Sequence, residues 1–102
     1  MEYRTGMVTD RPIRLAVLLS GSGRTLQNLA KVIAGGELDA EILVVIASRR
    51  SALGLERAGR LNLPRQLVDR KSYQSPTAFS DVLFKTIRKA EVDLVCLCGF
   101  LS

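Results

Sequence analysis

The sequence has no histidine, no tryptophan and only two cysteines among its 102 residues. The lack of histidine removes the commonest metal ligand and the side chain that most often transfers protons near neutral pH. Two cysteines alone do not make a zinc site, because zinc takes four ligands. If Cys96 and Cys98 belong to a strand, they share one face and pack there as small hydrophobic residues. We therefore expect no metal site.

Long apolar runs are missing as well. No stretch reaches the roughly 20 apolar residues of a membrane-spanning helix, and residues 1–12 lack the apolar segment of a signal peptide. We expect a cytoplasmic chain without membrane contacts. Hydrophobic residues make up 47% of the sequence, which is enough for one small core. The expected organisation is a flexible tail over residues 1–12 and one folded unit over residues 13–102.

Basic residues outnumber acidic ones, 15 against 10, which gives a formal net charge of +5. The basic residues are scattered along the chain, with neighbouring pairs such as Arg49–Arg50 and Arg70–Lys71. No nucleic-acid-binding motif accompanies them. The charge therefore favours small acidic ligands, such as phosphorylated metabolites, as partners and argues against nucleic acid.

Strand-like and helix-like segments alternate along the chain. Short apolar runs predict buried strands over residues 14–19, 40–47, 64–68 and 93–98. Apolar residues at helical spacing predict helices from residue 26 to Gly35, over residues 53–61, and from the N-cap Ser75 onward. This order predicts an α/β fold with a doubly wound, Rossmann-like parallel sheet in the strand order 3-2-1-4. Ligands of such sheets bind where the order reverses, here between the first and fourth strands.

A glycine-rich turn follows the first strand at this switch point. Free N–H groups and the positive dipole end of the next helix favour an anion there. The candidate binding residues are Gly21, Ser22, Gly23, Arg24 and Thr25. The turn lacks the third glycine of a dinucleotide fingerprint, because Leu26 stands there, and it lacks the lysine of a mononucleotide phosphate loop. Three readings stay open: an NADP-type domain using Arg49 and Arg50, a non-catalytic phosphate-binding module, and a connection without a ligand.

Three strings, LLSGSGRTLQNL, VIASRRSALGLERA and DLVCLCGFLS, occur in this order. Together they resemble the glycinamide ribonucleotide formyltransferase family of purine biosynthesis. The resemblance implies transfer of a formyl group from 10-formyltetrahydrofolate to glycinamide ribonucleotide. It places the substrate phosphate on Gly23, Arg24 and Thr25, and it places the start of the folate pocket at Leu101 and Ser102. The family usually has asparagine at position 22, serine at 24, asparagine at 25 and often arginine at 102.

The resemblance also implies an absence. Members of this family use an Asn-x-His pair and a later aspartate for the chemistry, and this sequence has no histidine. We therefore expect the chain to be the amino-terminal, substrate-binding half of such an enzyme, truncated after the fourth strand, with no catalytic residues of its own. A fourth strand left at the edge of the sheet exposes apolar side chains, which predicts self-association.

Overall fold

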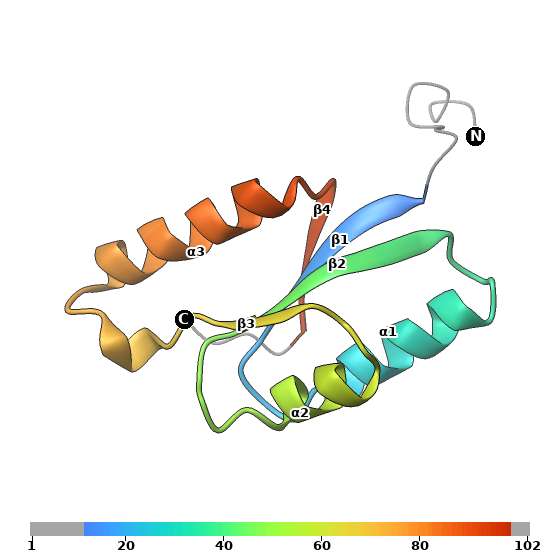
Figure 1. Ribbon diagram of the computed structural model, residues 1–102, viewed down its shortest axis with the longest axis horizontal. Coiled ribbons are helices and arrows are strands. Elements are labelled where there is room, and N and C mark those ends of the chain that lie inside the picture. The colour runs from blue at the N-terminus through green and yellow to red at the C-terminus, as the bar shows by residue number, and fades with distance from the viewer. Residues whose placement is uncertain (1–11, 99–102) are drawn as a thin grey trace.

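The computed structural model describes residues 12–98, which form a four-stranded sheet and its covering helices (Figure 1). The elements are β1 (Ile13–Leu19), α1 (Arg24–Ala34), β2 (Ala40–Ala47), α2 (Leu53–Arg60), β3 (Arg65–Leu67), the 3-10 helix η2 (Arg70–Ser72), α3 (Pro76–Ala90) and β4 (Leu94–Leu97). Each expected strand and helix is present within a residue or two of its expected ends. The expectations for the tail and for Leu101 and Ser102 fall outside the described residues.

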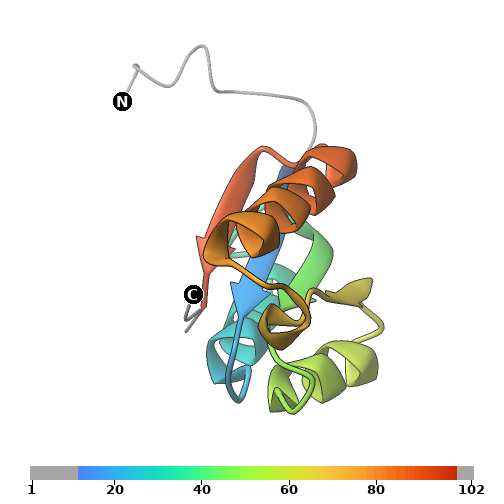
Figure 2. The same cartoon turned by 90° about the vertical axis from the view of Figure 1, so that its left-hand side faces the viewer.

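The sheet is parallel and has the order β3-β2-β1-β4, which confirms the predicted order 3-2-1-4. β1 lies between β2 and β4, and Figure 2 shows β4 at the edge of the sheet. Asp93 fixes the start of β4 against β1, because its carboxylate accepts a hydrogen bond from the Arg14 backbone N–H at 2.8 Å. The switch point of the doubly wound sheet therefore lies between the carboxyl ends of β1 and β4.

Helices cover both faces of the sheet, with α1 and α2 on one side and α3 on the other (Figure 1). Alternate residues of β1 enter two separate cores, as the pleat of a strand requires. Leu15, Val17 and Leu19 pack toward α1 and α2, whereas Ala16 and Leu18 pack toward α3. The apolar residues of α3 pack in this second core, where Phe79 and Leu83 are buried and Val82 and Ile87 are partly buried.

A register shift changes which residues of β2 face each core. The pairing of β1 with β2 slips between Leu15 and Ala16, whose partners are Ile42 and Val44. Leu43 is the extra residue, as in a β-bulge. Ile42 and Val45 consequently face the α1 and α2 side, while Val44 and Ile46 face α3.

The edge strand β4 is much less buried than β1. Leu94 and Leu97 are 53% and 67% exposed. Cys96 and Cys98 are partly buried and pack against the same core as α1 and α2, as expected for residues two apart in a strand. The described residues therefore leave apolar side chains of β4, beside the switch point, exposed to solvent.

Candidate functional site

The glycine turn begins where β1 ends, and two buried serines fasten it to the neighbouring turn. Ser20 and Ser48 are 2% and 1% exposed, and their hydroxyl oxygens lie 2.6 Å apart in a hydrogen bond. The Ser48 backbone N–H also donates to the Leu19 carbonyl at 3.1 Å. The segments that follow β1 and β2 are thus held together at the carboxyl edge of the sheet.

The N-terminus of α1 carries backbone N–H groups without a side-chain cap. Its N-cap is Gly23, at a φ of 81°, and no side chain caps it. The first intrahelical bond runs from the Gln27 N–H to the Gly23 carbonyl at 3.0 Å, so the N–H groups of residues 24–26 precede it. In contrast, the Ser75 hydroxyl caps α3 by accepting a hydrogen bond from the Ala78 N–H at 3.1 Å. The start of α1 is therefore suited to an external anion.

Gly23 owes its identity to two constraints. Its positive φ strains any residue with a Cβ, and a Cβ at this position would lie 2.6 Å from the Cα of Gly54 in α2. A side chain at this position would therefore collide with the backbone of α2. Gly54 is constrained in turn, since its Cβ would lie 2.5 Å from a methyl carbon of Leu19. At Gly21 a Cβ meets no described atom within 4 Å.

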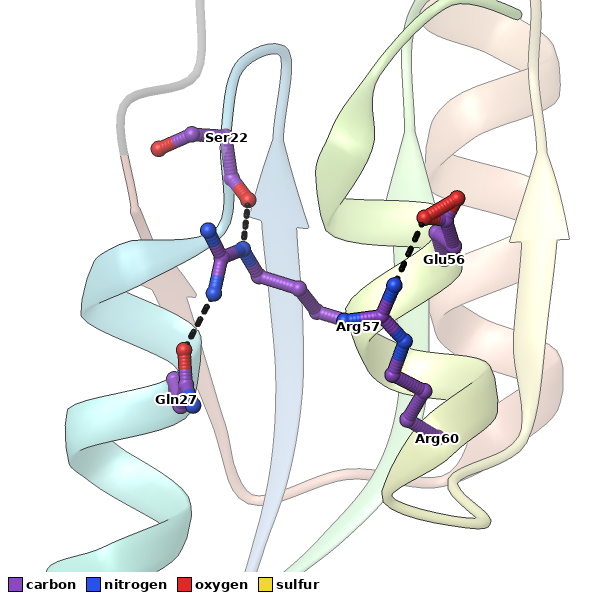
Figure 3. Close-up of polar contacts among 5 residues, drawn as sticks. All are labelled: Ser22, Gln27, Glu56, Arg57 and Arg60. Carbon is purple, nitrogen blue, oxygen red and sulfur yellow. Dashed lines mark hydrogen bonds and ion pairs between the residues drawn. The ribbon is translucent and has the colours of Figure 1, made fainter.

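Arg57 of α2 connects the turn with α1 (Figure 3). Its Nε donates a hydrogen bond to the Ser22 carbonyl at 2.6 Å, and its Nη1 donates to the Oε1 of Gln27. Sequence reasoning gave Arg57 no role. The available signal was the GLERA string, residues 54–58, which contains both Gly54 and Arg57. The structure brings this string against the glycine turn.

Arg49 and Arg50 line a separate hollow at the carboxyl ends of β2 and β3. Its volume is about 620 Å³, and its lining includes the basic residues Arg49, Arg50, Arg70 and Lys71 together with Asp69. Arg50 lies at the outer limit of an ion pair, with its Nε 4.0 Å from a carboxylate oxygen of Asp69. The Arg50 side chain is 79% exposed, so water screens this interaction and it adds little stability.

The remaining chemistry of the described part of the chain is sparse. Residues 12–98 hold no group of three or more metal-ligating side chains. No helix among them is long and apolar enough to cross a membrane. Burial raises the pKa of the Cys98 thiol, and neighbouring Cys96 raises it further. The turn from Gly21 to Thr25 is therefore the candidate site.

Known proteins match this chain over nearly its whole length. It is 36% identical over 101 residues to the trifunctional purine biosynthetic protein adenosine-3 of Drosophila pseudoobscura pseudoobscura, covering 96% of the chain and 7% of that protein. It is 31% identical over 89 residues to the phosphoribosylglycinamide formyltransferase of Haemophilus influenzae, covering 87% of the chain and 42% of that enzyme. The chain thus spans less than half the length of these relatives.

Solved structures agree with the sequence matches. Glycinamide ribonucleotide transformylase 1 from Symbiobacterium toebii superposes with a TM-score of 0.85 at 38% identity, over 92% of this chain and 44% of that one. Phosphoribosylglycinamide formyltransferase from Coxiella burnetii, solved in complex with CHES, gives a TM-score of 0.86 at 36% identity, over 90% and 43%. The family model described as formyl transferase matches residues 13–102. The chain therefore belongs to the formyl transferase family.

Proposed function

We propose that this chain is the substrate-binding half of a phosphoribosylglycinamide formyltransferase and that it holds the phosphate of glycinamide ribonucleotide at Gly21–Thr25. The observation that carries the proposal is the uncapped N-terminus of α1, which lies at the switch point of the sheet. Backbone N–H groups and the helix dipole act together on an anion at such a position. The relatives named above support the identity of the phosphorylated substrate.

The phosphate contacts we propose come mainly from the backbone. The N–H groups of Gly23, Arg24 and Thr25 bind the phosphate oxygens, and the Thr25 hydroxyl adds one further hydrogen bond. Arg24 and Thr25 are both exposed, so an incoming ligand reaches them without a rearrangement of the fold. The Arg24 guanidinium adds a charge-assisted contact. Binding through backbone groups also explains why residues 22, 24 and 25 need not match the usual residues of the family.

The second substrate in this proposal is 10-formyltetrahydrofolate, and Leu101 and Ser102 are its proposed first contacts. In the reaction, the substrate amine attacks the formyl carbon and the formyl oxygen gains negative charge. The bond from the formyl carbon to the folate nitrogen then breaks, the amine loses a proton, and the leaving folate nitrogen gains one. A positioned acid–base group and an oxyanion stabiliser are needed for these steps. With no histidine in the sequence, we assign to this chain binding and not proton transfer, and we expect no formyl transfer by the purified chain. The proposed location is the cytoplasm.

Calorimetric titration of the purified chain tests this proposal. We expect glycinamide ribonucleotide to bind and to be displaced by ribose 5-phosphate, because both present the same phosphate. Glycinamide riboside, which is the ribonucleotide without its phosphate, should bind far more weakly. Binding of NADP with no response to glycinamide ribonucleotide would instead support a dinucleotide-binding domain. Equal binding of the ribonucleotide and its phosphate-free form would exclude the glycine turn as a phosphate site.

A further inference from the structure

Two successive carbonyl groups of the glycine turn are hydrogen-bonded to α2. The Gly21 carbonyl accepts a bond from the Gly54 backbone N–H at 3.0 Å. The Ser22 carbonyl accepts the bond from Arg57 Nε at 2.6 Å (Figure 3). Helix α2 thus fixes the direction of two neighbouring peptide groups.

These bonds also determine where the following N–H groups point. The described residues contain no cis peptide bond, and in a trans peptide group the carbonyl and the N–H point in opposite directions. Because the carbonyls of Gly21 and Ser22 face α2, the N–H groups of Ser22 and Gly23 face away from it. Both N–H groups are then free to join those at the start of α1. A reversed Ser22–Gly23 peptide would present a carbonyl oxygen there and repel an anion.

We infer that Arg57 is a positioning residue of the phosphate site: its guanidinium holds the Ser22–Gly23 peptide with the Gly23 N–H directed at the bound phosphate. The inference rests on the proposed function for the identity of the ligand. Arg57 suits the task because its second bond, to Gln27, ties the same guanidinium to the first turns of α1. One planar group with several donors therefore sets the turn and the helix relative to each other.

The alternative is that Arg57 favours phosphate binding only through its positive charge. The test must distinguish this effect from the positioning of the peptide group. Arg60 provides the matched control, because it lies on the same helix, carries the same charge and bonds to Glu56 at 3.0 Å. Figure 3 shows Arg57 directed at Ser22 and Gln27, while Arg60 is directed at Glu56. Removing either arginine changes the net charge equally, but only Arg57 contacts the turn.

The experiment compares Arg57→Met, Arg57→Lys and Arg60→Met with the unchanged chain, using glycinamide ribonucleotide as the probe. We expect Arg57→Met to raise the dissociation constant about tenfold, which is the order expected when one charge-assisted hydrogen bond is lost. Arg60→Met should stay within about twofold. Arg57→Lys keeps the charge and one donor nitrogen but loses the planar fork, so it should recover part of the affinity. Residual dipolar couplings of the Gly23 N–H, measured without ligand, report the orientation of the peptide directly.

We expect this coupling to change in Arg57→Met and to stay unchanged in Arg60→Met. Equal losses of affinity in the two methionine variants would reduce the role of Arg57 to charge and overturn the inference. An unchanged Gly23 coupling in Arg57→Met would overturn it as well. If Arg57→Met fails to fold, Arg57→Lys tests the inference in its place. Full affinity together with an altered Gly23 coupling in this variant would contradict positioning. Failure of the unchanged chain to bind would refute the proposed function, while the coupling still tests the hold of Arg57 on the turn.

Discussion

Alanine substitutions at Gly21, Gly23 and Gly36 separate the cost of backbone strain from the cost of close packing at Gly23 of the candidate site. Gly21 has open space around its Cβ position and no positive φ, whereas Gly36 has open space but a φ of 81°. Gly23 has the same φ as Gly36 and, in addition, the Gly54 backbone 2.6 Å from its Cβ position. The series therefore adds one constraint at a time.

The expected costs follow from these two constraints. Left-handed backbone costs a residue with a Cβ about 1–2 kcal/mol, and alanine recovers about half of that through the unfolded state, so Gly36→Ala should lose roughly 1 kcal/mol. A contact with a rigid backbone adds about 1–3 kcal/mol, which gives roughly 2–4 kcal/mol for Gly23→Ala. Gly21→Ala should stay within about 0.5 kcal/mol. For a domain of this size, the loss at Gly23 corresponds to a melting temperature lower by roughly 10–30 °C.

Urea denaturation followed by circular dichroism measures all three variants. The order of stability should be Gly21→Ala, then Gly36→Ala, then Gly23→Ala. If Gly23→Ala proved no less stable than Gly36→Ala, the close packing of α1 on α2 would be refuted. Glycinamide ribonucleotide binding by Gly21→Ala then shows whether the ligand approaches the turn at Gly21, free of any effect on folding.

Three further predictions concern the ligand, the thiols and the edge strand. Thr25→Ala should weaken ribonucleotide binding by about 1 kcal/mol, the worth of one neutral hydrogen bond, while Thr77→Ala at the matching position of α3 should leave the affinity unchanged in calorimetry. Because burial raises the pKa of Cys98, the folded chain keeps this proton at alkaline pH where the unfolded chain has lost it, so stability falls as pH rises above about 8.5. In Cys98→Ala, the urea midpoint should depend less on pH across this range. An unchanged pH dependence would contradict the assignment of this effect to Cys98. The exposed Leu97 of β4 should promote association at high concentration, and sedimentation velocity should show Leu97→Lys to be more monomeric; a monomeric unchanged chain would contradict this.

The sequence was sufficient to predict the sheet but not the contacts between its loops. Alternating apolar segments and the right-handed rule for parallel crossovers limit the possible strand orders, so the order 3-2-1-4 could be predicted from the sequence. The register shift at Leu43 was not predicted, because an apolar run such as that of β2 has no alternation to reveal it. The 3-10 helix Arg70–Ser72 is too short to leave a periodic signal.

The role of Arg57 was beyond sequence reasoning for a different reason. Its partner Ser22 lies 35 residues away, and a partly exposed arginine follows no pattern that names its acceptor. The same holds for Gly23 and Gly54, whose mutual contact depends on how two helices approach each other. A positive φ at Gly23 can be expected from a glycine-rich turn in the sequence. The backbone atom that excludes a Cβ there cannot be predicted in this way. Elements and strand order were predictable from the sequence, while the contacts between separate loops and helices needed the structure.

The most direct test of the phosphate site is to map, by amide chemical shifts of the isotopically labelled chain, where glycinamide ribonucleotide binds. The glycine turn and the hollow at Arg49, Arg50, Arg70 and Lys71 compete for an anion, and they lie on different segments. We predict that the largest shifts fall on the N–H groups of residues 22–26 and that they saturate with the affinity seen in calorimetry. Largest shifts at residues 48–51 and 69–71, with residues 22–26 unmoved, would contradict the account.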